Sequence, residues 1–132
     1  MNRGLHHATI LIVDDDETEL FLLRHNLEGA GFAVQEAATA EEGLDACRSN
    51  RPDALVLDAT LPGMDGFEMC RLLRTQSAHR ALPILMLTGR EDPQCRTHAF
   101  EAGVTDFMTK TTDWEHIVKR VRALVDTGSL AA

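Results

Sequence analysis

Cysteine is scarce in this chain of 132 residues. The three cysteines, Cys47, Cys70 and Cys95, are odd in number and far apart, so they do not indicate a disulfide framework. No Cys-x-x-Cys pair is present either, and a zinc site is therefore not indicated. We expect small, mostly buried thiols in a reducing compartment.

Long hydrophobic runs are also absent. No apolar run reaches the roughly 18 residues that a transmembrane helix needs. The first nine residues lack the apolar core of a signal peptide. From this pattern we expect a cytoplasmic protein with no membrane partner.

An excess of basic residues is missing as well. The chain has 13 Lys and Arg against 21 Asp and Glu, which gives a formal net charge of -8. A protein that binds the phosphate backbone of nucleic acids needs the opposite sign, so we expect no direct nucleic-acid partner. A divalent cation, or a basic patch on another protein, matches this charge better.

Five short apolar runs are spaced along the chain, at residues 9–13, 33–36, 54–57, 84–87 and 104–108. Four of the five are rich in Val, Ile and Leu with little polar alternation, which is typical of strands buried on both faces. The composition, 44% hydrophobic and 26% charged, is that of one folded domain.

Helix signals fill the segments between these runs. Capping patterns predict helix starts at four positions: Thr39, Asp65, Thr112 and Asp92. Gly31 and Gly103 are predicted to end helices in the left-handed conformation. The strand–helix order occurs five times, which predicts an α/β domain with a parallel sheet and helices on both faces. We expect this domain at residues 9–126, an N-terminal tail at 1–8, and a C-terminal tail or linker stub at 127–132.

Polar residues follow four of the predicted strands. Ligands of an open α/β sheet bind beyond the carboxyl ends of its strands. The residues at these ends are Asp14, Asp15, Asp16, Asp58, Thr88 and Lys110. Clustered carboxylates repel one another, and a hard cation relieves this repulsion. A set of ligands made only of oxygen atoms favours Mg²⁺. A carboxylate beside Mg²⁺ can attack phosphorus, whereas Asp16 and Asp65 can equally be simple helix caps.

These residues lie in motifs that resemble the receiver domain of two-component response regulators, in the superfamily of the chemotaxis regulators. The motifs are Ile10-Leu11-Ile12-Val13-Asp14-Asp15-Asp16, Leu57-Asp58 with Leu61-Pro62-Gly63-Met64-Asp65-Gly66, Leu87-Thr88, and Phe107-Met108-Thr109-Lys110. The resemblance covers residues 9–126. It implies a flavodoxin-like, doubly wound fold: a five-stranded parallel sheet in the order 2-1-3-4-5, flanked by five helices.

The resemblance also implies roles for single residues. Asp58 is expected to be the phosphoacceptor, with Thr88 and Lys110 contacting the phosphoryl oxygens. Phe107 stands at the aromatic switch position, where an inward rotation of the ring follows phosphorylation; an ordinary core phenylalanine is the alternative. Thr60 and Arg90, together with Gly89, are expected to set the lifetime of the phosphate.

The implied cofactor is Mg²⁺. Its protein ligands are expected to be Asp14, Asp15, Asp58 and the backbone carbonyl of Thr60. One departure from the family stands beside this site, because the usual proline after the lysine is replaced by Thr111. We expect a trans bond with a shifted loop, or a strained cis bond.

The implied function is that of a signalling phosphoacceptor, and not of an enzyme beyond self-catalysed phosphoryl transfer and dephosphorylation. The donor is a histidine kinase or a histidine phosphotransfer protein. Phosphorylation is expected to change the surface of the fourth helix, fifth strand and fifth helix, which then controls an output domain or partner, or forms a homodimer. Trp114, followed by Lys119-Arg120-Val121-Arg122, is similar to receivers that precede cyclic-di-GMP enzymes.

Two other functions remain open at this point. A receiver fold can serve as an interaction module that signals without phosphate, and the loss of the proline after Lys110 is consistent with this. Alternatively, Asp14-x-Asp16-x-Thr18 fits the pattern of haloacid-dehalogenase-type phosphatases, with Asp14 as nucleophile and Asp16 as acid/base.

Overall fold

The computed structural model describes residues 7–89 and 93–131. The strands are β1 (Thr9–Val13), β2 (Ala33–Ala37), β3 (Ala54–Asp58), β4 (Ile84–Thr88) and β5 (Asp106–Thr109). The helices are α1 (Glu17–Gly29), α2 (Ala40–Asn50), α3 (Gly66–Arg74), α4 (Pro93–Ala102) and α5 (Trp114–Ala131), with a short 3-10 helix, η2 (Ser77–His79), after α3.

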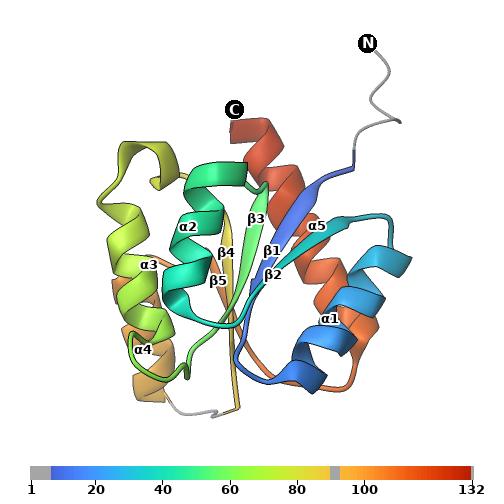
Figure 1. The fold of residues 1–132 in the computed structure, drawn as a ribbon, viewed down its shortest axis with the longest axis horizontal. Coiled ribbons are helices and arrows are strands. Elements are labelled where there is room, and N and C mark those ends of the chain that lie inside the picture. Colours follow the sequence, from blue (N-terminus) through green and yellow to red (C-terminus); the bar gives the residue numbers. More distant parts are fainter. Residues whose placement is uncertain (1–6, 90–92, 132) are drawn as a thin grey trace.

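The five strands form one parallel sheet in the order β2-β1-β3-β4-β5, as predicted. Figure 1 shows this sheet between two helical layers, with α2, α3 and α4 on one face and α1 and α5 on the other. The doubly wound α/β fold expected from the strand–helix order is therefore confirmed. Parallel strands place all their carboxyl ends at one edge of the sheet, where the candidate site lies.

The two faces of the sheet each have a hydrophobic core. On β1, Leu11 and Val13 pack into the core beneath α2, α3 and α4, whereas Ile10 and Ile12 pack beneath α1 and α5. This alternation follows from the two-residue period of a strand. Because burial of each such side chain contributes about 1.5–3 kcal/mol, both faces hold the helices against the sheet.

Two of the predicted element starts are wrong. The fifth strand begins at Asp106 and not at residue 104, because the N–H of Val104 donates to the carbonyl of Ala99 and closes the end of α4. The last helix begins at Trp114 with Asp113 as its cap, since the Asp113 carboxylate accepts from the N–H of His116 at 3.2 Å. Aspartate is the stronger cap residue, and it displaces the predicted start at Thr112.

The other predicted helix signals that can be compared are confirmed. Thr39 and Asp65 accept hydrogen bonds from the N–H groups of Glu42 and Glu68 and so cap α2 and α3. Gly31 and Gly103 both have positive φ, at 98° and 106°. The predicted cap Asp92 lies outside the described residues.

The helix α5 continues beyond Asp126 to Ala131. Its apolar residues Ile117, Val121 and Leu124 face the core between α1 and the sheet, in the pattern of an amphipathic helix. Among the described residues no helix combines the length and apolar content needed to cross a membrane.

Candidate functional site

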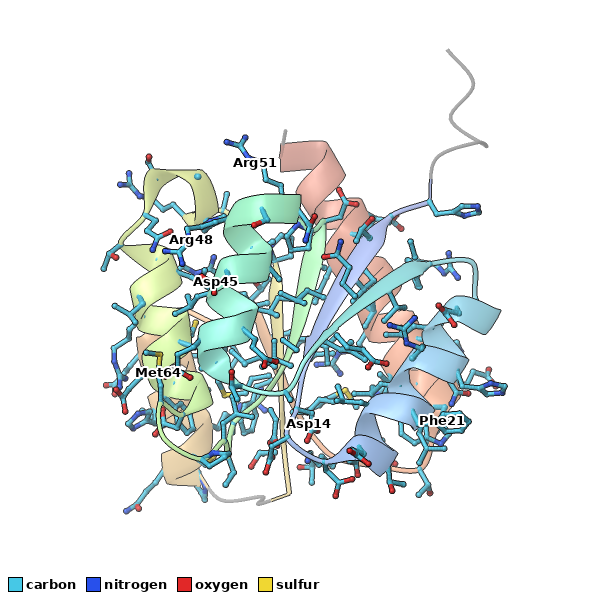
Figure 2. All side chains as sticks on the ribbon, in the orientation of Figure 1. Asp14, Phe21, Asp45, Arg48, Arg51 and Met64 are labelled. Carbon is cyan, nitrogen blue, oxygen red and sulfur yellow. The ribbon has the colours of Figure 1, made fainter. Side chains whose placement is uncertain are left out.

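The acidic residues Asp14 and Asp58 lie side by side at the carboxyl edge of the sheet. Strands β1 and β3 are neighbours with Val13 opposite Leu57, so the residues that follow these two positions meet at the same edge. Both side chains are buried, with 2% of Asp14 and 6% of Asp58 exposed. Figure 2 shows Asp14 at this edge and Arg51 at the opposite edge of the molecule.

Three carboxylates gather at this point. Ligand oxygens of Asp14, Asp15 and Asp58 all lie within 4.8 Å of one another, and Asp15 is exposed. The N–H of Asp16 donates to Asp14 at 2.9 Å, and the N–H of Thr60 donates to Asp58 at 3.1 Å. These bonds fix the two buried carboxylates, while the exposed side leaves room for water. An oxygen-only set of this kind fits Mg²⁺, which retains several waters.

The ammonium group of Lys110 completes the cluster. Its Nζ lies 3.4 Å from a carboxylate oxygen of Asp14 and 3.4 Å from one of Asp58. Among the residues that the structure describes, one cation faces three carboxylates, so this part of the site keeps an excess of negative charge. Such a site favours a divalent cation, and the lysine can pair with an incoming anion.

Burial and charge together set the protonation of the site. Burial, with a smaller effect of the nearby Asp14 carboxylate, raises the pKa of Asp58 to about 6, against the opposing effects of the Thr60 N–H and of Lys110. Burial acts to lower the pKa of Lys110, but the charges of Asp58, Asp14 and Glu19 outweigh it and the pKa is raised. At neutral pH Asp58 is thus mainly a carboxylate and Lys110 an ammonium.

Thr88 lies at the end of β4, one residue beyond the position that pairs with Asp58. Only 1% of its surface is exposed, and its carbonyl accepts from the backbone N–H of Lys110 at 2.7 Å. The thiol of Cys95 on α4 donates to the Thr88 hydroxyl at 3.9 Å. Sequence reasoning missed this contact, because nothing in the spacing of Thr88 and Cys95 indicates which face of α4 meets β4.

Gly66 allows the loop after β3 to fold back on the site. A Cβ at this position would lie 2.3 Å from the carbonyl oxygen of Asp58, so only glycine fits. The N–H of Gly66 donates to the carbonyl of Ala59 at 3.1 Å. The sequence motif contained this glycine, but the reason for it is a close approach that only the folded chain reveals.

Phe107 on β5 is buried, with 5% of its surface exposed, and packs in the core beneath α2, α3 and α4. The guanidinium carbon of Arg96 on α4 lies 6.0 Å from the centre of this ring. Of the residues expected to set the phosphate lifetime, Thr60 and Gly89 are exposed beside the site, and Arg90 lies outside the described residues.

Of the two expected peptide geometries after Lys110, the structure has the trans bond. No peptide bond between described residues is cis, so the bond before Thr111 is trans. The Thr111 hydroxyl accepts from the N–H of Asp113 at 3.0 Å and turns the chain toward α5. The loop therefore reaches the last helix without a proline.

Asp16 has a structural role. Its carboxylate accepts from the N–H groups of Thr18 and Glu19, at 2.8 and 3.1 Å, and caps α1. The helix begins directly after it at Glu17, which leaves no room for an insertion after β1. This arrangement argues against the phosphatase alternative, in which Asp16 acts as the acid/base.

Comparison with known proteins gives a consistent result. The response regulator receiver domain family matches residues 10–122. The alkaline phosphatase synthesis transcriptional regulatory protein PhoP of Bacillus subtilis is 39% identical over 123 residues, which cover 93% of this chain and 50% of PhoP. The response regulator MprA of Mycobacterium avium is 43% identical over 116 residues, which cover 88% of this chain and 50% of MprA. The chain spans about half the length of these curated relatives.

The fold is also found among solved structures. The chemotaxis response regulator CheY4 of Vibrio cholerae superimposes with a TM-score of 0.85 at 31% sequence identity. The match covers 90% of this chain and 99% of CheY4.

Proposed function

Because the chain belongs to the response regulator receiver family, we propose that it accepts a phosphoryl group on Asp58 in the presence of Mg²⁺. The observation that supports this most directly is the buried Asp58 carboxylate, which lies 3.4 Å from Lys110 and within 4.8 Å of the carboxylates of Asp14 and Asp15. The phosphoryl donor would be a histidine kinase or a histidine phosphotransfer protein.

The chemistry follows from the groups at the site. A carboxylate oxygen of Asp58 bonds to phosphorus while the bond from phosphorus to the imidazole nitrogen of the donor breaks, and the imidazole keeps that electron pair. Mg²⁺, held by Asp14, Asp15, Asp58 and the Thr60 carbonyl, would neutralise charge on the phosphoryl oxygens. Lys110 and the Thr88 hydroxyl supply further donors to these oxygens.

The new charge would then change the surface of the domain. A dianionic group on Asp58 draws Lys110 and the Thr88 hydroxyl toward it, and the Thr88 hydroxyl lies against Cys95 on α4. As a result, we expect a second conformation of α4, β5 and α5 to become more populated. In that conformation the Phe107 ring moves together with Thr88. We propose that this surface contacts a partner, an output domain or a second copy of the chain.

The experiment that tests the proposal is intact mass spectrometry after incubation with a small acyl-phosphate donor and Mg²⁺. The unaltered chain should gain one phosphoryl group, and the gain should be lost in Asp58→Asn and with a chelator. Asp65→Asn is the matched control, because Asp65 caps α3 and should not affect labelling. Labelling that persists in Asp58→Asn would contradict the assignment.

The output of the receiver can be proposed from its relatives. PhoP and MprA are about twice as long as this chain, and PhoP is by its name a transcriptional regulator. We therefore propose a cytoplasmic receiver that controls a transcriptional output. Control of a cyclic-di-GMP enzyme has only the half-buried Trp114 and the basic residues of α5 in its favour.

A phosphate-independent interaction module is the second candidate, and Thr111 in place of the usual proline is the observation in its favour. Binding of a partner that is unchanged in Asp58→Ala would support this alternative.

A further inference from the structure

Among the residues that the structure describes, the N-terminal half of α4 has little apolar packing apart from Cys95. The buried residues of this helix are Ala99 and Ala102, both small and both in its C-terminal half. A cavity of about 260 Å³ lies beside the N-terminal half, lined by residues that include Phe67, Thr88 and His98. Few buried contacts and adjacent free space are the features of a segment that opens at low cost.

The C-terminal end of α4 is fixed in place by Arg74 of α3. The Nε of Arg74 donates to the carbonyl of Gly103 at 2.8 Å, and its Nη1 donates to the carbonyls of His79 at 2.9 Å and Leu82 at 2.7 Å. The absent Cβ of Gly103 makes room for this side chain, since a Cβ there would lie 2.7 Å from Arg74. One half-buried guanidinium thus ties the end of α4 to the segment before β4.

Besides the contacts of Cys95 with Thr88 and of His98 with Phe67, the N-terminal part of α4 is held by Arg96. Its guanidinium carbon lies 5.5 Å from the ring centre of Phe100 on the same helix and 6.0 Å from that of Phe107 on β5. The second contact joins α4 to the buried ring at the predicted switch position. A cation over an aromatic ring at an exposed position is a weak interaction, so it can hold the helix without preventing its movement.

We propose that Arg96 is a positioning residue, whose contact with the Phe107 ring holds the N-terminal half of α4 against β5 while Arg74 fixes the other end of the helix. Opening then occurs at the end of α4 that carries Cys95, next to Thr88. The role of Arg96 in holding α4 does not depend on the proposed function. Its role in transmitting phosphorylation from Asp58 to α4 does rest on that function.

Amide hydrogen exchange of Arg96→Gln tests the positioning role. We expect the amides of residues 97–99 to exchange about two- to fivefold faster, in line with the loss of the cation–π contact that joins α4 to Phe107, with little change at 101–103. Arg96→Lys, which keeps a cation, should restore most of the protection. The control is Arg122→Gln, because Arg122 makes the same kind of contact with Phe32, at 5.1 Å, and should leave α4 unchanged. Equal exchange in Arg96→Gln and the unaltered chain would overturn the inference.

A second measurement with Mg²⁺ and beryllofluoride, a phosphoryl mimic, separates this inference from the proposed function. If both hold, beryllofluoride changes the exchange of α4 in the unaltered chain, and Arg96→Gln exchanges faster without it. If beryllofluoride has no effect on either chain but Arg96→Gln still exchanges faster, the proposed function fails and the positioning role stands. If beryllofluoride alters α4 but Arg96→Gln behaves as the unaltered chain, the positioning role fails.

Discussion

The ammonium group of Lys110 lies 3.4 Å from a carboxylate oxygen of Asp58, although Asp58 ends β3 and Lys110 follows β5, two strands that are not neighbours in the sheet. The same lysine also donates its backbone N–H to the carbonyl of Thr88. One residue therefore joins the acid at the end of β3 to the hydroxyl residue at the end of β4.

The first prediction concerns Lys110→Met. This change removes the cation that lowers the pKa of Asp58 and that can pair with phosphoryl oxygens. Charged hydrogen bonds contribute about 1.5–3 kcal/mol, so the initial labelling rate at neutral pH should fall about 10- to 100-fold. Intact mass at timed intervals measures this rate. Lys119→Met on α5 is the control, since Lys119 is exposed, and an equal loss in both variants would count against a specific role for Lys110.

The second prediction concerns the stability of Asp58→Asn. Burial raises the pKa of Asp58 to about 6, above the ordinary value near 4, so the folded chain binds this proton more tightly than the unfolded chain. Stability contributed by the site is therefore greatest below about pH 4 and falls as the pH rises to about 6.

Asparagine removes the free-energy cost of a buried negative charge at position 58, because its side chain does not ionise. At pH 7, with a chelator present, the free energy of unfolding of Asp58→Asn should be up to about 3 kcal/mol higher than that of the unaltered chain. This difference should vanish below about pH 4. Urea unfolding at several pH values measures both. A variant that is less stable at pH 7 would show that the carboxylate is not penalised by its surroundings.

The third prediction concerns the divalent cation. Asp15 is exposed and belongs to the carboxylate cluster, so Asp15→Ala removes a predicted ligand at little cost to packing. The affinity for Mg²⁺ should fall about tenfold or more, as expected for the loss of one charge near the ion. Titration calorimetry measures it. Asp16→Asn is the comparison, because it removes a neighbouring charge but keeps a cap for α1, and it should change the affinity far less.

The fourth prediction concerns Gly66→Ala. The new methyl group would lie 2.3 Å from the carbonyl oxygen of Asp58, so the loop after β3 must move. We expect a loss of about 1–3 kcal/mol in the free energy of unfolding together with slower labelling. Gly29→Ala, where no atom lies within 4 Å of the added Cβ, should instead be neutral or slightly stabilising. Similar losses at both positions would indicate a general effect of glycine replacement.

The sequence was sufficient for the sheet and for most helix starts, since each depends on local chemistry. Residues 9–13 form an apolar run that ends at Asp14, and β1 has these limits. The fifth strand was placed two residues early because Val104 is apolar and suits a strand, whereas its N–H is engaged with Ala99 at the end of α4. An apolar pattern does not show which carbonyl a backbone N–H will reach.

The site was predictable to the same extent. Strand ends identify Asp14, Asp58, Thr88 and Lys110, because parallel strands bring their carboxyl ends together. The contacts of Arg74 with Gly103 and of Arg96 with Phe107 were not predictable, because they depend on how α3 and α4 rotate about their axes when they pack. The sequence spacing of these pairs contains no such information.

The contact between Lys110 and Asp14 joins residues 96 positions apart in the chain. During synthesis the segments through β4 leave the ribosome before Lys110 does. Lys110 follows β5, the edge strand that is made last, so a nascent chain that ends before it has the three carboxylates but not the lysine that pairs with two of them. Until β5 joins the sheet, like charges at this edge repel one another, and the final strand is the one that relieves this repulsion.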